Sequence, residues 1–162
     1  MLAELYQPDE RWPLLGIPTR EEYVRSCVPL APLPAHLPED VQKSFRTVVH
    51  LVALAWYHYP LIDEALKKLF GMAEMAVKIR CQQLAIPLSI THKNKERPLP
   101  LATLITQLCT QLQRPDLETR LHSIRNIRNS YAHPGHHFYA GITAVSAIQP
   151  IAATIAQLFA TE

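Results

Sequence analysis

Residues 60–84, PLIDEALKKLFGMAEMAVKIRCQQL, decide the fold class of this chain of 162 residues. Apolar side chains recur in this stretch at intervals of three and four residues, which is the spacing of one face of an α-helix. Proline at position 60 suits a first helical turn, and Pro87 prevents the helix from continuing. The stretch therefore predicts a helix of about six turns. Its apolar stripe consists of Ile62, Leu66, Leu69, Ala73, Ala76, Val77 and Leu84.

Helical periodicity continues on both sides of this stretch. Before it, Pro38 and two acids suit a first turn, and the apolar positions up to Ala55 wrap so much of the surface that we expect that helix to be central. After it, the sequence predicts helices over residues 99–112, from Pro115 to about Ala132, and over 139–159, where Pro150 is a candidate kink. The prediction is an all-α domain over residues 38–162.

Two segments lie outside the helical pattern. Residues 91–98 are polar and mostly basic, which predicts a solvated loop, although such a loop could also contact an anionic ligand. Residues 1–37 form a proline-rich arm, in which regular helix is expected only briefly over Arg20–Cys27. The arm carries Trp12 and several aliphatic residues. We therefore expect it to pack on its own domain, or alternatively on a partner.

Composition limits the function classes. The net charge is only +2, so any affinity for nucleic acid must come from local clusters of cations. The three cysteines lie far apart and are odd in number, which argues against a disulfide framework and suits a reducing compartment. The longest apolar run is too short to span a bilayer, and the first residues do not resemble a signal peptide. We expect a cytoplasmic protein that makes no contact with a membrane.

Arg128 interrupts the apolar stripe of the helix that begins at Pro115. An arginine stands there at a position where a leucine is expected, and burial of an unpaired guanidinium is unfavourable. The sequence therefore predicts that Arg128 finds an acid, a carbonyl oxygen or a ligand anion. The stripe is made of Leu117, Leu121, Ile124, Arg128 and Tyr131.

His133 follows Arg128 by five residues, about 140° further around an ideal helix, so the two side chains diverge if the helix continues. Pro134 disfavours the helical conformation of His133 and allows the chain to turn there. A permanently charged guanidinium and an imidazole that titrates near neutrality suit chemistry on a phosphodiester. Arg125 and His122, one and two turns earlier, add positive or titratable groups.

Residues Arg128–His133 fit the signature Arg-x4-His, with an asparagine directly after the arginine. Together with the phrases Arg125–Gly135 and Leu69–Ala76, this segment resembles the HEPN superfamily of small all-helical domains. The context agrees, because the motif ends a penultimate helix and a final apolar helix follows. The resemblance covers about residues 40–160 and leaves the arm unexplained.

The resemblance implies a four- or five-helix up-and-down bundle and a metal-independent endoribonuclease that needs no cofactor. Arg128 and His133 would be its catalytic pair, and Asn129 a supporting polar residue. In that mechanism the RNA 2′-OH attacks its adjacent phosphate, while His133 transfers protons and Arg128 stabilises the growing negative charge. The products are a 2′,3′-cyclic phosphate and a 5′-OH. Glu74 is the candidate for the acid that often accompanies the pair; the alternative is an ordinary ion pair with Lys78.

The resemblance also implies partners. Such proteins commonly pair as homodimers, which places two motifs in one cleft, and many are prokaryotic toxins or antiviral-defence effectors. The implied partners are RNA, a second copy of the chain, and an antitoxin or a defence-system protein. His136 and His137 join Arg125 and His122 as candidate contacts to RNA.

Two other functions fit the residues. The chain can be a non-catalytic HEPN interaction module, or a scaffold that binds RNA or a nucleotide, in which Arg128 only pairs with an acid. It can also be a metal-binding regulator, because His133, His136 and His137 are close enough in sequence to hold zinc or copper. No cysteine or acid lies nearby to complete a coordination set, so the sequence favours RNA contacts or simple exposure for these imidazoles.

Overall fold

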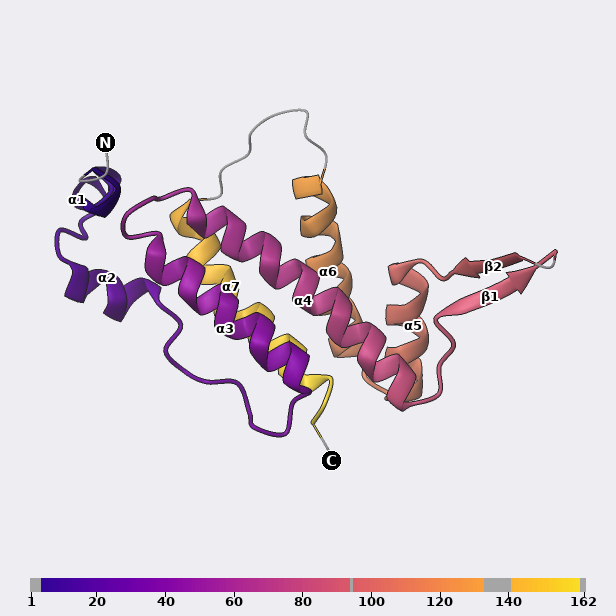
Figure 1. Ribbon diagram of the computed structural model, residues 1–162. Helices are drawn as coiled ribbons and strands as arrows, with labels where there is room; N and C mark the ends of the chain where they lie inside the picture. Colours follow the sequence, from indigo (N-terminus) through magenta and orange to yellow (C-terminus); the bar gives the residue numbers. More distant parts are fainter. Residues whose placement is uncertain (1–3, 94, 133–140, 161–162) are drawn as a thin grey trace.

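The computed structural model describes residues 4–93, 95–132 and 141–160, and it is predominantly helical (Figure 1). The prediction of a helical fold is confirmed at that level. One small antiparallel sheet adds to the helices. The described elements are η1 (Glu4–Tyr6), α1 (Arg11–Leu14), α2 (Arg20–Cys27), α3 (Glu39–Leu54), α4 (Leu61–Gln83), β1 (Ser89–His92), β2 (Lys95–Pro98), α5 (Leu101–Gln111), α6 (Pro115–Ala132) and α7 (Ile142–Gln157).

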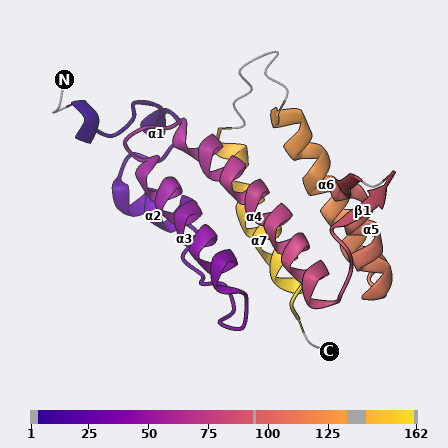
Figure 2. The ribbon, with the colours of Figure 1, turned by 45° about the vertical axis from the view of Figure 1, so that its right-hand side comes forward.

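Helix α4 is the central element of the fold. It packs against α3, α5, α6 and α7, and Figures 1 and 2 show α3 on one side of it and α6 with α5 on the other. Its buried side chains reach around much of its surface, as expected for a helix with neighbours on several sides. They are Ile62, Asp63, Ala65, Leu66, Leu69, Phe70, Met72, Ala73, Ala76, Val77 and Cys81.

The expectation that the helix over residues 39–55 is central is wrong. Helix α3 packs mainly against α4 and α2. Lys43, Arg46 and His50, which recur at helical spacing, are exposed along its outer side. Its apolar positions are therefore divided between a face toward α4 and a face toward the arm.

Helices α5 and α6 lie beside each other along one side of α4 (Figure 2). The chain turns between them at Gln113, whose φ of 54° lies in the left-handed region. The hydroxyl of Thr106 on α5 donates a hydrogen bond of 2.8 Å to Glu118 on α6. Apolar packing dominates this contact, because Leu104, Leu108, Leu117 and Leu121 are all buried.

The arm packs on the α3–α4 connection through aromatic side chains. Trp12 and Tyr23 are fully buried with ring centroids 4.5 Å apart, and Tyr59 lies 4.9 Å from Trp12. The indole of Trp12 donates a hydrogen bond of 3.0 Å to the carbonyl of Ala55, and the Tyr23 hydroxyl donates to the carbonyl of Val52. Residues of the arm therefore belong to the same core as the helices.

In the segment 91–98, which we predicted to be a solvated loop, residues 91–92 and 95–98 instead lie in two antiparallel strands. Strands β1 and β2 pair in the register Ser89↔Pro98, Ile90↔Arg97, Thr91↔Glu96 and His92↔Lys95. The backbone N–H of Leu99 donates a hydrogen bond of 2.8 Å to the carbonyl of Leu88, which continues the pairing toward the core. The prediction was wrong because the strands lack an alternation of apolar and polar residues that would indicate a buried face.

Within the described parts of the chain, no helix is both long enough and apolar enough to cross a membrane.

Candidate functional site

The stripe of α6 is buried at its apolar positions and reaches the surface at Arg128. Leu117, Leu121 and Ile124 are at most 8% exposed, whereas the side chain of Arg128 is 42% exposed. The arginine that interrupts the stripe therefore lies at the edge of the core. Its guanidinium is accessible to a ligand and at the same time lies close to α4.

The carboxylate of Glu74 on α4 is shared by two cations. Its Oε2 lies 2.9 Å from Nη2 of Arg128, and its Oε1 lies 2.7 Å from Nζ of Lys78 one turn further along α4. The acid therefore contacts the motif arginine and also forms the ion pair with Lys78, whereas its part in a catalytic site stays a prediction. Partly exposed ion pairs contribute only about 0–1 kcal/mol, so an incoming anion can replace Glu74 beside Arg128 at small cost.

Arg125 lies one turn before Arg128 and faces the same narrow space between α4 and α6. This space, lined also by Glu74, has a volume of about 10 Å³, room for about one water molecule. Nη2 of Arg125 donates a hydrogen bond of 2.8 Å to Asn126, while its Nε is buried without a hydrogen-bond partner in the described chain. Three cations (Arg125, Arg128 and Lys78) and one carboxylate leave an excess of two positive charges here.

The other predicted residues of α6 lie at different distances from this cluster. Oδ1 of Asn129 lies 3.5 Å from Nη1 of Arg128, at the limit of a hydrogen bond. His122 lies six residues before Arg128, roughly 9 Å along the helix axis. Its Nε2 lies 3.3 Å from Thr106 Oγ1 on α5 and 3.6 Å from Glu118 Oε1. The structure therefore brings Asn129 to the cluster and holds His122 against α5 instead.

The described end of α6 contacts α4 through a pair of aromatic rings. The ring of Tyr131 meets that of Phe70 edge to face, with centroids 5.6 Å apart. Burial raises the pKa of Tyr131, and the nearby carboxylate of Asp63 raises it further. Asp63 is only 3% exposed, although it stands in the first turn of α4. Sequence reasoning missed Asp63, because acids are common in a first helical turn and only burial sets this one apart.

His133, His136 and His137 lie outside the described residues. The proposed pairing of Arg128 with His133, and the proposed RNA contacts of the other two histidines, therefore stay predictions. In the parts of the chain that the structure describes, no three His, Cys, Asp or Glu side chains are placed to hold a metal ion together.

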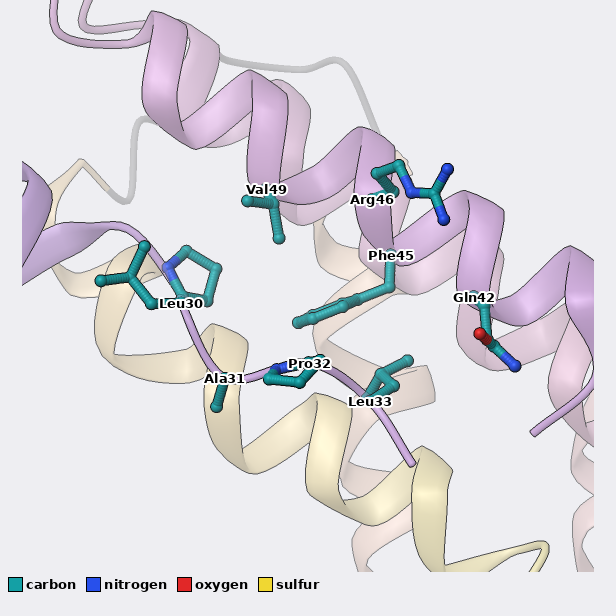
Figure 3. A pocket seen from close by; sticks show the side chains of 9 residues that line it. Leu30, Ala31, Pro32, Leu33, Gln42, Phe45, Arg46 and Val49 are labelled. Carbon is teal, nitrogen blue, oxygen red and sulfur yellow. The ribbon is translucent and has the colours of Figure 1, made fainter. Parts of the chain in front are cut away.

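A separate hollow of about 240 Å³ lies between residues 29–33 of the arm and α3 (Figure 3). Leu30, Pro32, Phe45 and Val49 line it, and Arg46 lies at its edge. Figure 3 shows the ring of Phe45 extending from α3 toward the arm. The lining contains no acid, histidine or nucleophile, so the candidate site for chemistry is the cluster on α4 and α6.

Comparison of the chain with protein-family models, with curated proteins and with solved structures gave no match.

Proposed function

We propose that the chain is a metal-independent endoribonuclease of HEPN type that cleaves RNA to 2′,3′-cyclic phosphate and 5′-OH ends. The observation that carries the proposal is the position of Arg128. It combines the sequence signature Arg-x4-His with a side chain that is 42% exposed and whose guanidinium lies 2.9 Å from an acid of a neighbouring helix. This combination suits a group that binds a phosphate and holds it in a fixed place.

The charges around Arg128 favour a phosphodiester over a neutral ligand. Arg125 and Lys78 raise the local positive charge, and Arg125 keeps a buried nitrogen without a hydrogen-bond partner in the described chain. Guanidinium groups bind phosphate oxygens through two parallel hydrogen bonds. Glu74 holds the guanidinium of Arg128 in place until a phosphate occupies the site.

The reaction follows from these roles. The 2′-oxygen of a ribose attacks the adjacent phosphorus, and the bond from phosphorus to the 5′-oxygen of the next nucleotide breaks. His133 is proposed to take the proton from the 2′-OH and to return a proton to the leaving 5′-oxygen. Arg128 stabilises the negative charge of the pentacoordinate phosphorane, and Arg125 assists it. Asn129 supports the position of the arginine.

The proposal extends to assembly and context. An up-and-down bundle of HEPN type that pairs as a homodimer would contribute two copies of the motif to one cleft. We propose that the protein acts in the cytoplasm of a prokaryote as a toxin or an antiviral-defence effector. Its regulating partner is then an antitoxin or another protein of the defence system.

Cleavage of RNA tests this proposal directly. The purified chain is incubated with end-labelled RNAs of varied sequence, and the product ends are identified. We expect 2′,3′-cyclic phosphates, cleavage that persists in EDTA, and loss of cleavage in folded Arg128→Ala and His133→Ala variants. Arg120→Ala is the matched control, because Arg120 stands on the same helix and pairs with Asp116. A folded, dimeric protein that leaves all RNAs intact, alone and with its binding partners, contradicts the proposal.

A non-catalytic interaction module is the second candidate, and the ion pair between Arg128 and Glu74 favours it. In that function the pair only fastens α6 to α4. It then follows that Arg128→Ala lowers the thermal stability and has no effect on any RNA.

A further inference from the structure

The hairpin of β1 and β2 extends away from the helices (Figure 1). From Ile90 to Pro98, every described residue is exposed. The partly buried Leu88 and Leu99 anchor the base of the hairpin to the core. Four residues in each strand give a reach of about 13 Å at about 3.3 Å per residue. Two-stranded hairpins without a packed face are marginally stable, so a projecting one contributes little to the stability of the fold.

The register of the hairpin separates its side chains into two unlike faces. Residues that pair across antiparallel strands share a face, and successive residues alternate between faces. One face carries Ser89, Thr91, Glu96 and Pro98, and on it Ser89 donates a hydrogen bond to Glu96. The opposite face, which we call the basic face, carries Ile90, His92, Lys95 and Arg97.

The cations of the basic face have no acidic partner among the residues that the structure describes. No carboxylate of the described residues lies within ion-pair distance of Lys95 or Arg97. Lysines elsewhere in the chain do have such partners: Lys43 pairs with Glu39 at 2.8 Å, and Lys67 pairs with Glu64 at 2.7 Å. The one acid of the hairpin, Glu96, is on the opposite face. The basic face therefore presents uncompensated positive charge on a projecting hairpin.

We infer that the basic face of the hairpin binds the phosphate backbone of RNA. A two-stranded ribbon is narrow enough to follow a nucleic-acid strand or to enter a groove. Lys95 and Arg97 neutralise phosphates, and the aliphatic side chain of Ile90, which is 50% exposed, contacts a ribose or a base. A single exposed isoleucine is too little apolar surface for stable attachment to a lipid bilayer.

This inference rests on the proposed function for its choice of RNA among polyanions, but its test does not need catalysis. The hairpin gives the enzyme a second contact with its substrate, apart from the cluster around Arg128. Binding is measured in the His133→Ala background, so that the probe stays intact. If the wild-type chain never cleaves RNA and the hairpin still binds it, the proposed function fails and the inference stands.

The probe is a labelled single-stranded oligouridine, and its dissociation constant is measured by fluorescence anisotropy at several salt concentrations. For a single strand, each phosphate contact contributes about −0.7 to the slope of the logarithm of the association constant against the logarithm of the salt concentration. We expect the pair Lys95→Gln and Arg97→Gln to weaken binding and to reduce the slope by about 1.4. The charge-matched control, Lys43→Gln with Lys67→Gln, should leave the slope unchanged. Ile90→Ala should weaken binding without changing the slope.

Two outcomes overturn the inference. In the first, the Lys95→Gln and Arg97→Gln double variant leaves the slope unchanged, or the control double variant reduces the slope by the same amount. The second of these results would show that only the net charge of the protein determines binding. In the second, the hairpin pair abolishes binding to phosphatidylserine vesicles while binding to oligouridine is unaffected, and the basic face is then a membrane contact. Circular dichroism shows whether each variant keeps the helical fold.

Discussion

The contact of the arm with α3 and the α3–α4 connection differs in composition from the contact of α6 with α4. Trp12 and Tyr23 are fully buried, and their polar atoms bond to backbone carbonyls of α3 and its end. Between α6 and α4, by contrast, Arg128 and Glu74 meet at the surface, where the two side chains are 42% and 24% exposed. The arm is held in place by buried aromatic surface, whereas part of the contact between α6 and α4 consists of charges in contact with water.

This difference teaches which contact can change its partners. Burial of large aromatic side chains contributes several kcal/mol per residue and leaves no polar group to exchange. A partly exposed ion pair contributes about 0–1 kcal/mol and can exchange one anion for another. The arm contact is therefore suited to stability, and the α4–α6 contact to ligand binding.

The largest expected effect is that of Trp12→Ala. Removal of a fully buried indole should lower the free energy of unfolding by about 3–5 kcal/mol, because it leaves a cavity among Tyr23 and Tyr59. Leu14→Ala is the control, since Leu14 lies in the same short helix and is 85% exposed. Denaturant unfolding measures both. A loss below about 1 kcal/mol for Trp12→Ala would remove the contrast between the two contacts.

A smaller loss is expected at Gly141, which precedes α7 with a φ of 53°. A methyl group there collides with the hydroxyl of Tyr59, the group that accepts a hydrogen bond of 2.8 Å from the N–H of Ile142. Gly141→Ala should therefore cost about 1–3 kcal/mol. Gly71→Ala, inside α4 with open space around it, should instead gain about 0.5–1 kcal/mol. Equal changes in melting temperature for Gly141→Ala and Gly71→Ala would contradict the steric conflict that we expect at Gly141.

The fold was predictable from the sequence where proline and helix-capping residues mark the ends of the helices. The bounds Arg20–Cys27 and Pro115–Ala132 agree with the structure, because proline and capping residues mark them in the sequence. The hairpin was missed since neither strand has a buried face. In the site, the contact of Arg128 with Glu74 depends on how far α6 slides along α4, which periodicity within one helix does not determine. The burial of Asp63 likewise depends on how the helices pack against each other, which the periodicity of one helix does not determine.

Thiol reactivity gives a second comparison of the arm with the helices around α4. Burial raises the pKa of Cys27, at the end of α2 in the arm, and burial with nearby acids raises that of Cys109, on α5, from 9.0 to about 11. At pH 8 both therefore react only when the structure opens. In single-cysteine variants we expect Cys27 to react with Ellman's reagent about tenfold faster, a difference of about 1.4 kcal/mol, because Cys27 is 5% exposed and Cys109 only 1%.

The raised pKa of Cys109 has a consequence for stability. The unfolded chain loses the thiol proton near pH 9.0, before the folded chain does, so the contribution of Cys109 is complete below that pH and declines between pH 9 and about 11. Equal labelling rates for Cys27 and Cys109 would contradict the expected difference in accessibility between the two thiols.

The smallest effect on stability is expected for Glu74→Gln, and it separates the two candidate functions. Loss of the partly exposed ion pairs of Glu74 with Arg128 and Lys78 should together cost about 0–1 kcal/mol, and the difference from wild type should vanish at 1 M salt, where the Debye length falls to about 3 Å. Glu64→Gln is the matched control, because Glu64 stands on the same helix and pairs with Lys67 at 2.7 Å. Both variants should unfold alike, but only Glu74→Gln should slow RNA cleavage, since it alone releases the guanidinium of Arg128. If Glu74→Gln instead costs several kcal/mol and leaves no activity to lose, the ion pair serves to fasten α6, and the interaction module is the better description.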